Sequence, residues 1–128
     1  MIILDENFTE SQRQLLRSWR IPIRQIGYEV GRAGMKDDEI TPLLHQLRRP
    51  TFFSLDLGFY RRTHCHARYC IICLDVGDYN AATFVRRLLK HPLFDSEAKR
   101  LNRVVRLSSA GITFWQIGID GEQRVGWP

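Results

Sequence analysis

The residues of this sequence that are best placed to do chemistry are aspartates that follow short apolar runs. Asp5 follows the apolar residues 1–4, and Asp56 follows the β-branched and aromatic residues 51–55. An acid that ends a buried strand is costly to desolvate unless a partner or a ligand stabilises it. In parallel α/β sheets, ligand sites open at the carboxyl ends of the strands. We therefore predict that Asp5 and Asp56 converge at one rim of a sheet.

A second group of acids stands at the expected start of a helix. Asp37, Asp38 and Glu39 follow a stretch with glycines at positions 27, 31 and 34. Each acid also suits the first turn of a helix whatever the function, and Asp37 is a good helix cap. Together with Asp5 and Asp56 they would form an oxygen-rich site of the kind that Mg²⁺ or Mn²⁺ accepts while keeping several waters. A cation would also neutralise carboxylates that otherwise repel one another.

Such a site suits the cleavage of phosphodiesters. A bound cation lowers the pKa of a water molecule and offsets the charge that builds on the phosphate. Glu6 and Glu39 would tune the site or ligate a second ion, and Asn7 could hydrogen-bond a carboxylate or a phosphate. The candidate metal ligands, direct or through water, are Asp5, Asp37 and Asp56.

The basic residues favour a polyanionic partner. The net charge is +5 with an isoelectric point near 9.5, and the guanidinium of arginine is a planar fork that fits phosphate. Arg61 and Arg62 follow Asp56 closely enough to contact a substrate at the same site. Phe59 and Tyr60 are expected to be available for stacking on unpaired bases.

The composition predicts one domain over residues 1–128. The chain has 44% hydrophobic and 26% charged residues, as ordinary globular proteins do. No apolar stretch approaches the ~20 residues that span a bilayer, and no secretion signal is apparent at the start. Three cysteines cannot all pair within one chain, so a reducing cytoplasm fits best.

Apolar runs alternate with stretches of helical period, which favours an α/β fold with a mostly parallel sheet. Helices are expected to begin near Thr9 or Ser11, near Asp37, and near Asp78 or Asn80. In the first of them, Gln12 is expected on the outward side. The predicted strands cover residues 1–4, 22–26, 51–55 and 69–74, and residues 104–107 and 112–117 form a C-terminal hairpin. An exposed edge near this hairpin could pair two copies into a homodimer.

Histidines and cysteines between positions 64 and 73 raise the alternative of a zinc site. Cys70 and Cys73 lie in a predicted strand, where residues three apart point to opposite faces. We therefore expect them to be small buried hydrophobes, and His64 and His66 to be loop residues.

Three motifs resemble the PIN-like family of short bacterial proteins that act as toxin components of toxin-antitoxin pairs. Residues 3–7, Ile-Leu-Asp-Glu-Asn, are similar to the start of that family. Residues 31–40, Gly-Arg-Ala-Gly-Met-Lys-Asp-Asp-Glu-Ile, are similar to its glycine loop and acidic helix start. Residues 54–56, Ser-Leu-Asp, followed by Phe59, are similar to its third acidic motif.

The resemblance implies a PIN-like, three-layer α/β/α fold and a ribonuclease that depends on Mg²⁺ or Mn²⁺ and is inhibited by a cognate antitoxin protein. It gives the metal-site role to Asp5, Asp37 and Asp56, with Glu6 and Glu39 beside them. The sequence departs from the family at Gly58, where the third motif usually carries a second aspartate. One carboxylate fewer would weaken metal binding, so a binding module with little or no activity is the main alternative.

A phospho-receiver domain is the other alternative. Such domains also place acids after the first strand and an aspartate after the third, as Asp5, Glu6 and Asp56 do. They also carry a serine or threonine after the fourth strand and a lysine after the fifth. Here Asp75 ends the fourth run and no lysine follows residue 100, so we rank the receiver below the nuclease.

Overall fold

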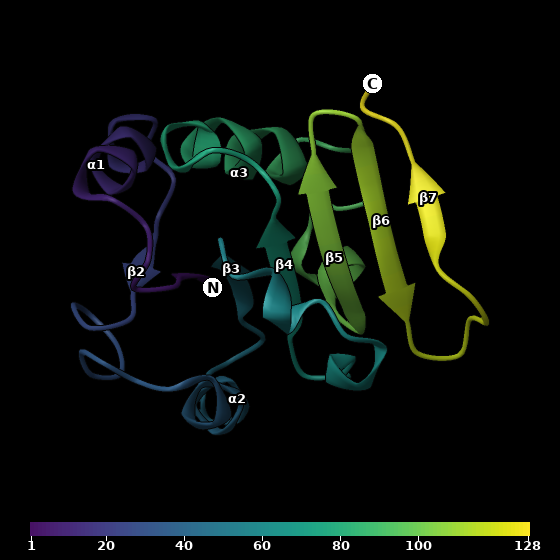
Figure 1. The fold of residues 1–128 in the computed structure, drawn as a ribbon, viewed down its shortest axis with the longest axis horizontal. Helices are drawn as coiled ribbons and strands as arrows, with labels where there is room; N and C mark the ends of the chain where they lie inside the picture. The colour runs from purple at the N-terminus through teal and green to yellow at the C-terminus, as the bar shows by residue number, and fades with distance from the viewer.

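The strands form one seven-stranded, mostly parallel sheet in the computed structural model, which describes all residues from 1 to 128 (Figure 1). Its spatial order is β2-β1-β3-β4-β5-β6-β7; the first five strands are parallel, and β6 and β7 run antiparallel to their neighbours. The predicted α/β class and the C-terminal hairpin are confirmed. The strands are β1 (Ile2–Leu4), β2 (Arg24–Gln25), β3 (Thr51–Ser54), β4 (Cys70–Leu74), β5 (Arg103–Ser108), β6 (Gly111–Gln116) and β7 (Gln123–Val125).

The helices fall where the helical periods predict them. Short 3₁₀ turns, η1 (Leu57–Phe59), η2 (Arg62–His64) and η3 (Asp78–Asn80), complete the connections. None of the helices has the length and apolar character needed to cross a bilayer. The helices are α1 (Glu10–Ser18), α2 (Asp37–Gln46), α3 (Ala81–Leu89) and α4 (Glu97–Arg100).

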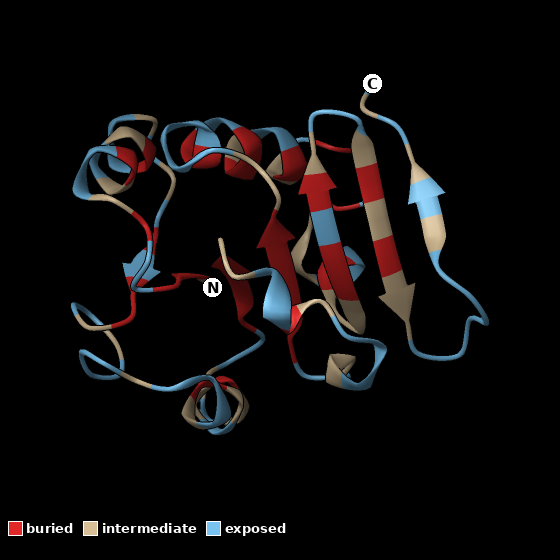
Figure 2. Ribbon diagram, viewed as in Figure 1, coloured by how far each residue is buried: buried red, intermediate tan, exposed pale blue.

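Alternate strand residues face two separate cores. Leu4 and Phe53 belong to a core that α1 and α3 cover, whereas Ile3 and Phe52 belong to a core that α2 covers. Figure 2 shows β3 and β4 buried along their whole length, while β7 has no buried residue. The central strands therefore read as continuous apolar runs because both of their faces are covered.

The crossovers that contain α1 and α3 have opposite hands. Both helices pack on the same face, but the first crossover leads from β1 toward the β2 edge and the other leads from β4 toward the β7 edge. Parallel crossovers are right-handed in about 98% of cases. One of these two connections therefore has the uncommon left hand, which places α3 beside α1.

The contact between α1 and α3 corrects the prediction for Gln12. The first helix is capped by Thr9, as predicted, whose Oγ1 accepts from the Gln12 backbone N–H at 3.4 Å. Gln12 itself is buried rather than outward, and its Oε1 accepts from the Ala82 backbone N–H at 2.9 Å. The apolar period of α1 gave no sign of this contact, because it depends on which helix packs against α1.

The cysteines lie as expected for core residues. Cys70 and Cys73 are both fully buried and belong to the two opposite cores. Burial raises the pKa of both thiols to about 12. The side chains of Cys70 and Cys73 therefore cannot chelate one ion together.

Candidate functional site

Asp5 and Asp56 follow neighbouring parallel strands. Strands β1 and β3 pair directly, with Leu4 beside Phe53, and the Asp5 backbone N–H extends the ladder by donating to the Phe53 carbonyl at 2.9 Å. The chain leaves β1 toward β2 on one side, while β3 lies on the other side, so this rim is a topological switch point of the sheet. Open α/β sheets bind ligands in the crevice at such points.

Ser54 joins the acidic residues of the two strands. Its side chain is fully buried, and its Oγ donates to Asp5 Oδ2 at 2.6 Å. The same oxygen accepts from the Asp56 backbone N–H at 3.0 Å and from Asn7 Nδ2 at 3.4 Å. From the sequence, Ser54 was predicted to belong to a motif but had no predicted role. Its position between an apolar run and an aspartate was the available signal.

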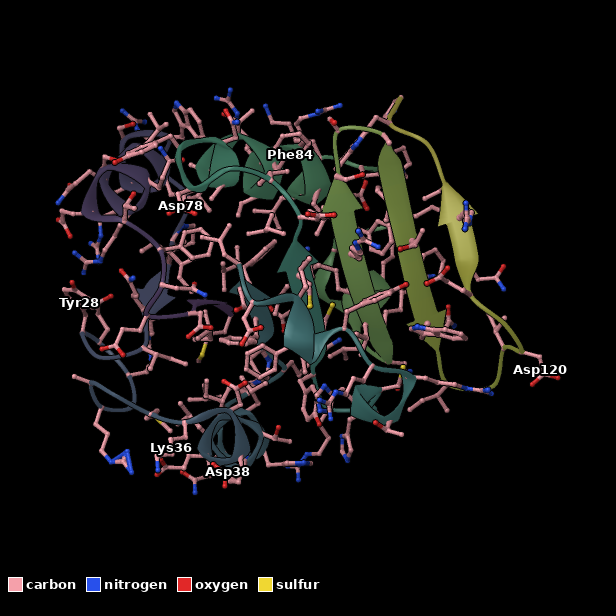
Figure 3. All side chains as sticks on the ribbon, in the orientation of Figure 1. Tyr28, Lys36, Asp38, Asp78, Phe84 and Asp120 are labelled. Atoms are coloured by element: carbon pink, nitrogen blue, oxygen red, sulfur yellow. The ribbon has the colours of Figure 1, made fainter.

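Asp37 comes to the site from the start of α2. Its predicted capping role is wrong: the helix begins at Asp37 after Lys36, and the Glu39 carboxylate accepts from the Lys36 backbone N–H at 3.1 Å. The Asp37 side chain interacts with Asp56 rather than with the helix backbone. Asp38, the next residue, lies on the outer side of α2, away from the sheet (Figure 3).

The three carboxylates of the site lie close enough for the charge of one to affect the pKa of another. Burial, followed by the charge of Asp56, raises the pKa of Asp37, and the nearby Arg61 guanidinium partly opposes this rise. Burial also raises the pKa of Asp5, with smaller contributions in the same direction from Asp37 and Asp56. The hydrogen bonds that Asp5 accepts from Ser54 Oγ and from the Glu6 backbone N–H, at 2.8 Å, lower its pKa in part. Loading the site with negative charge is therefore unfavourable without a cation.

The other two predicted acids contact the backbone around the site. Glu6 Oε1 accepts from the Gly34 backbone N–H at 2.9 Å. Gly27 has a φ of +88°, and a Cβ there would lie 2.9 Å from Glu6 Oε2. Glu39, besides its bond to Lys36, forms an ion pair with Arg32. Glu6 and Glu39 thus hold the glycine loop and the start of α2 in place and do not join the group of three.

Gly58, the departure from the third motif, has a structural role of its own. Its backbone N–H donates to Asp56 Oδ1 at 2.8 Å. A Cβ on Gly58 would lie only 3.0 Å from the same oxygen. Any larger residue at position 58 would therefore have to move the Asp56 carboxylate.

Of the two arginines predicted to contact the substrate, Arg61 lies near the acidic site and Arg62 lies toward the C-terminal hairpin. Arg61 lies close enough to Asp37 to lower its pKa. Arg62 lies over the Trp115 ring and pairs with Asp120 at 3.7 Å. Figure 3 shows Asp120 in the turn between β6 and β7. Phe59 is buried against Phe52, so the prediction that it could stack on bases is wrong: its ring fills the core beneath η1.

Tyr60 is also engaged within the protein. Its hydroxyl donates to Glu122 Oε2 at 2.6 Å and bonds Thr113 Oγ1 at 3.0 Å. Burial and the Glu122 contact raise the pKa of Tyr60. This half-buried ring ties η1 to the C-terminal hairpin.

Comparison with known proteins adds no further information about this site. No family model, curated protein or solved structure matches the chain.

The three aspartates do not form a preformed first coordination shell. No group of three or more histidine, cysteine, aspartate or glutamate side chains has the geometry to hold a metal ion directly. The charges of Asp37 and Asp56 nevertheless raise the pKa of Asp5, and the charge of Asp56 raises the pKa of Asp37. Such an arrangement fits an ion that keeps several of its waters, as Mg²⁺ does.

Proposed function

We propose that this chain is a metal-dependent ribonuclease of PIN-like type, with the three-layer α/β/α arrangement of that family. The observation that carries the proposal is the convergence of Asp5, Asp37 and Asp56 from β1, α2 and β3 at the switch point of the sheet. These are the residues that the three sequence motifs assign to the metal site.

Asp5, Asp37 and Asp56 would hold Mg²⁺ or Mn²⁺, directly or through its waters. When bound, the cation would lower the pKa of a water and offset charge on the scissile phosphate. The raised pKa values of Asp5 and Asp37 support this assignment, because repelling carboxylates gain most from a cation. Fixed in position by Ser54, Asp5 is the acid with the least freedom to move away.

The chain's own cations and amides would orient the RNA. Arg61, beside Asp37, is placed to bind a phosphate oxygen of the substrate. Asn7, which bonds Ser54 Oγ and accepts from the Leu55 backbone N–H at 3.5 Å, stands at the same rim. Arg62 would contact a more distant phosphate, since it faces the β6–β7 turn.

We further propose that the protein is the cytoplasmic toxin of a toxin-antitoxin pair. This part rests on the motif resemblance, and it implies a cognate antitoxin that inhibits the nuclease. Co-expression with the product of an adjacent reading frame would test it: a true antitoxin would copurify and suppress cleavage of RNA.

Cleavage of total RNA with Mn²⁺ or Mg²⁺ tests the enzymatic proposal. We expect wild-type protein to cleave RNA, chelation to abolish cleavage, and Asp5→Asn to lower the rate by at least about 100-fold, because a metal ligand is lost. Asp95→Asn is the matched control, since Asp95 is exposed and lies next to α4, which contacts the amino end of β1 at the opposite end of the sheet from the rim. Undiminished cleavage by Asp5→Asn would refute the assignment.

The strand order gives the phospho-receiver alternative a specific support. The order β2-β1-β3-β4-β5 is also that of flavodoxin-like sheets, to which receiver domains belong. Acetyl phosphate that labels Asp56, together with an absence of RNA cleavage, would favour this class. RNA binding without cleavage would instead favour the non-catalytic binding module.

A further inference from the structure

Arg100 is a buried cation without an anionic partner. Arg100 is only 6% exposed, and no carboxylate oxygen forms an ion pair with its guanidinium. Nε donates to Thr51 Oγ1 at 2.8 Å and Nη1 donates to the Phe94 carbonyl at 2.9 Å, while Nη2 has no partner in the protein. Burial lowers the pKa of this guanidinium. Nη2 reaches solvent at the cleft, where it is free to bind an anion.

Arg100 lines a cleft of about 760 Å³ that gathers further arginines. Arg20 and Arg24 have no ion-pair partner, and Arg17 contacts Glu29 at 3.4 Å. The one carboxylate in the lining, Glu97, is already neutralised by the terminal amine of Met1 at 2.9 Å and by Arg49 at 3.7 Å. The cleft is therefore a concentration of unneutralised positive charge.

Arg20, which lines the cleft, adopts a left-handed backbone conformation at the end of α1. Arg20 has a φ of +61° directly after α1, and the Ile21 N–H bonds the Leu16 carbonyl at 3.1 Å. This is the helix-ending geometry that glycine adopts with least strain. An arginine here carries a conformational cost that glycine would avoid, and in return its guanidinium reaches the cleft.

We propose that this cleft binds a nucleoside phosphate. Arginine forks recognise phosphate oxygens in pairs, and Arg20, Arg24 and Arg100 supply three of them around one space. Ile2, Ile21 and Pro22 on the wall of the cleft offer an apolar surface for a base. The volume is that of sites for small ligands.

The cleft is separate from the acidic rim. It opens beside Met1 and Ile2 and the residues before β2, at the amino ends of the strands, whereas Asp5 and Asp56 follow the carboxyl ends. The inference therefore does not depend on the nuclease proposal. The nucleoside phosphate could be a free nucleotide or the phosphorylated end of an RNA, since both present the same chemistry.

Thermal melting at constant ionic strength tests the proposal with AMP, ADP, adenosine and a short 5′-phosphorylated oligonucleotide. We expect the phosphorylated ligands to raise the melting temperature and adenosine to have no effect. In the double variant Arg20→Gln/Arg24→Gln, the dissociation constant should rise at least about tenfold. Both side chains are exposed, so this variant should fold. A response to the oligonucleotide alone would identify an RNA end as the source, whereas a response to AMP or ADP would identify a free nucleotide.

The control variant Arg48→Gln/Arg68→Gln removes the same charge from exposed positions outside the cleft and should bind as wild type. An equal loss in both double variants would show nonspecific charge attraction and overturn the proposal. It would also be overturned if no phosphorylated ligand stabilised the protein at about 10 mM, or if an acidic peptide bound in preference to all of them.

Discussion

Ser54 shows how a single buried hydroxyl can set the geometry of an acidic site. It donates to Asp5, accepts from the Asp56 backbone and contacts Asn7, so three of the residues at the rim are positioned relative to it. Asp5 and Asp56 could be predicted from the sequence because each ends an apolar run. Ser54 could not be, since a serine in a strand is equally consistent with a passive core position.

Replacing Ser54 with alanine should disturb both stability and titration. We expect a loss of about 1–3 kcal/mol in the free energy of unfolding, because buried polar groups lose their partner. The Ser54 bond lowers the pKa of Asp5, so its removal should raise that pKa and move metal binding to higher pH. Urea unfolding and metal titrations across pH measure the two effects. Ser109→Ala, at an exposed turn, should leave both unchanged.

Replacing Asp37 with asparagine should stabilise the metal-free protein at neutral pH. The pKa of Asp37 is raised on folding, so the folded state binds protons more tightly and stability falls as pH rises from the ordinary value of 3.8 through the raised value. The cost persists above that window and vanishes below it. In chelator, Asp37→Asn should therefore melt slightly higher than wild type at pH 7, with a gain that shrinks toward acid pH.

Asp38→Asn is the matched control for this experiment, because Asp38 lies on the outer side of the same helical turn. It should give a smaller gain, because its charge contributes less than that of Asp56 to the raised pKa of Asp37. If the two variants behaved alike in chelator at every pH, charge repulsion at the rim would not be the cause.

At the scale of elements, the positions of helices and strands along the chain follow from the sequence. Which helices and strands pack against one another does not. The periods of apolar residues and the cap at Thr9 predicted α1, α2 and α3. They could not predict that α3 crosses to the face of α1, because either hand of the crossover buries the same apolar stripe. The error at Gln12 came from this. The error at Asp37 has a local cause, because the N-cap of α2 is Lys36 and the Asp37 side chain interacts with Asp56.

Truncating Gln12 tests the junction of α1 and α3. Gln12→Ala should lower the free energy of unfolding by about 1–3 kcal/mol, because the Ala82 N–H at the start of α3 would lose its acceptor. Gln14→Ala, on the exposed side of α1, should cost far less. Chemical denaturation of the two variants gives the comparison, and equal costs would show that α1 and α3 are not joined through Gln12.

At the scale of the whole molecule, opposite charges gather at opposite ends of the sheet. The carboxyl ends of β1 and β3 carry Asp5 and Asp56, and the start of α2 brings Asp37 beside them. The amino end of β1 borders the arginine cleft. The net charge of +5 therefore does not reveal that acidic and basic side chains gather at opposite ends of the sheet. Composition predicted an affinity for polyanions, but only the fold separates the arginines from the acids that would hold a cation.

Calorimetric titration of the protein with Mn²⁺ at pH 7 tests the central claim, that Asp5, Asp37 and Asp56 form one cation site. We expect saturable binding to wild type and to Asp38→Asn, with affinity reduced at least about tenfold in Asp5→Asn and in Asp56→Asn. Unchanged binding in both rim variants, or no binding to wild type at about 10 mM Mn²⁺, would contradict it.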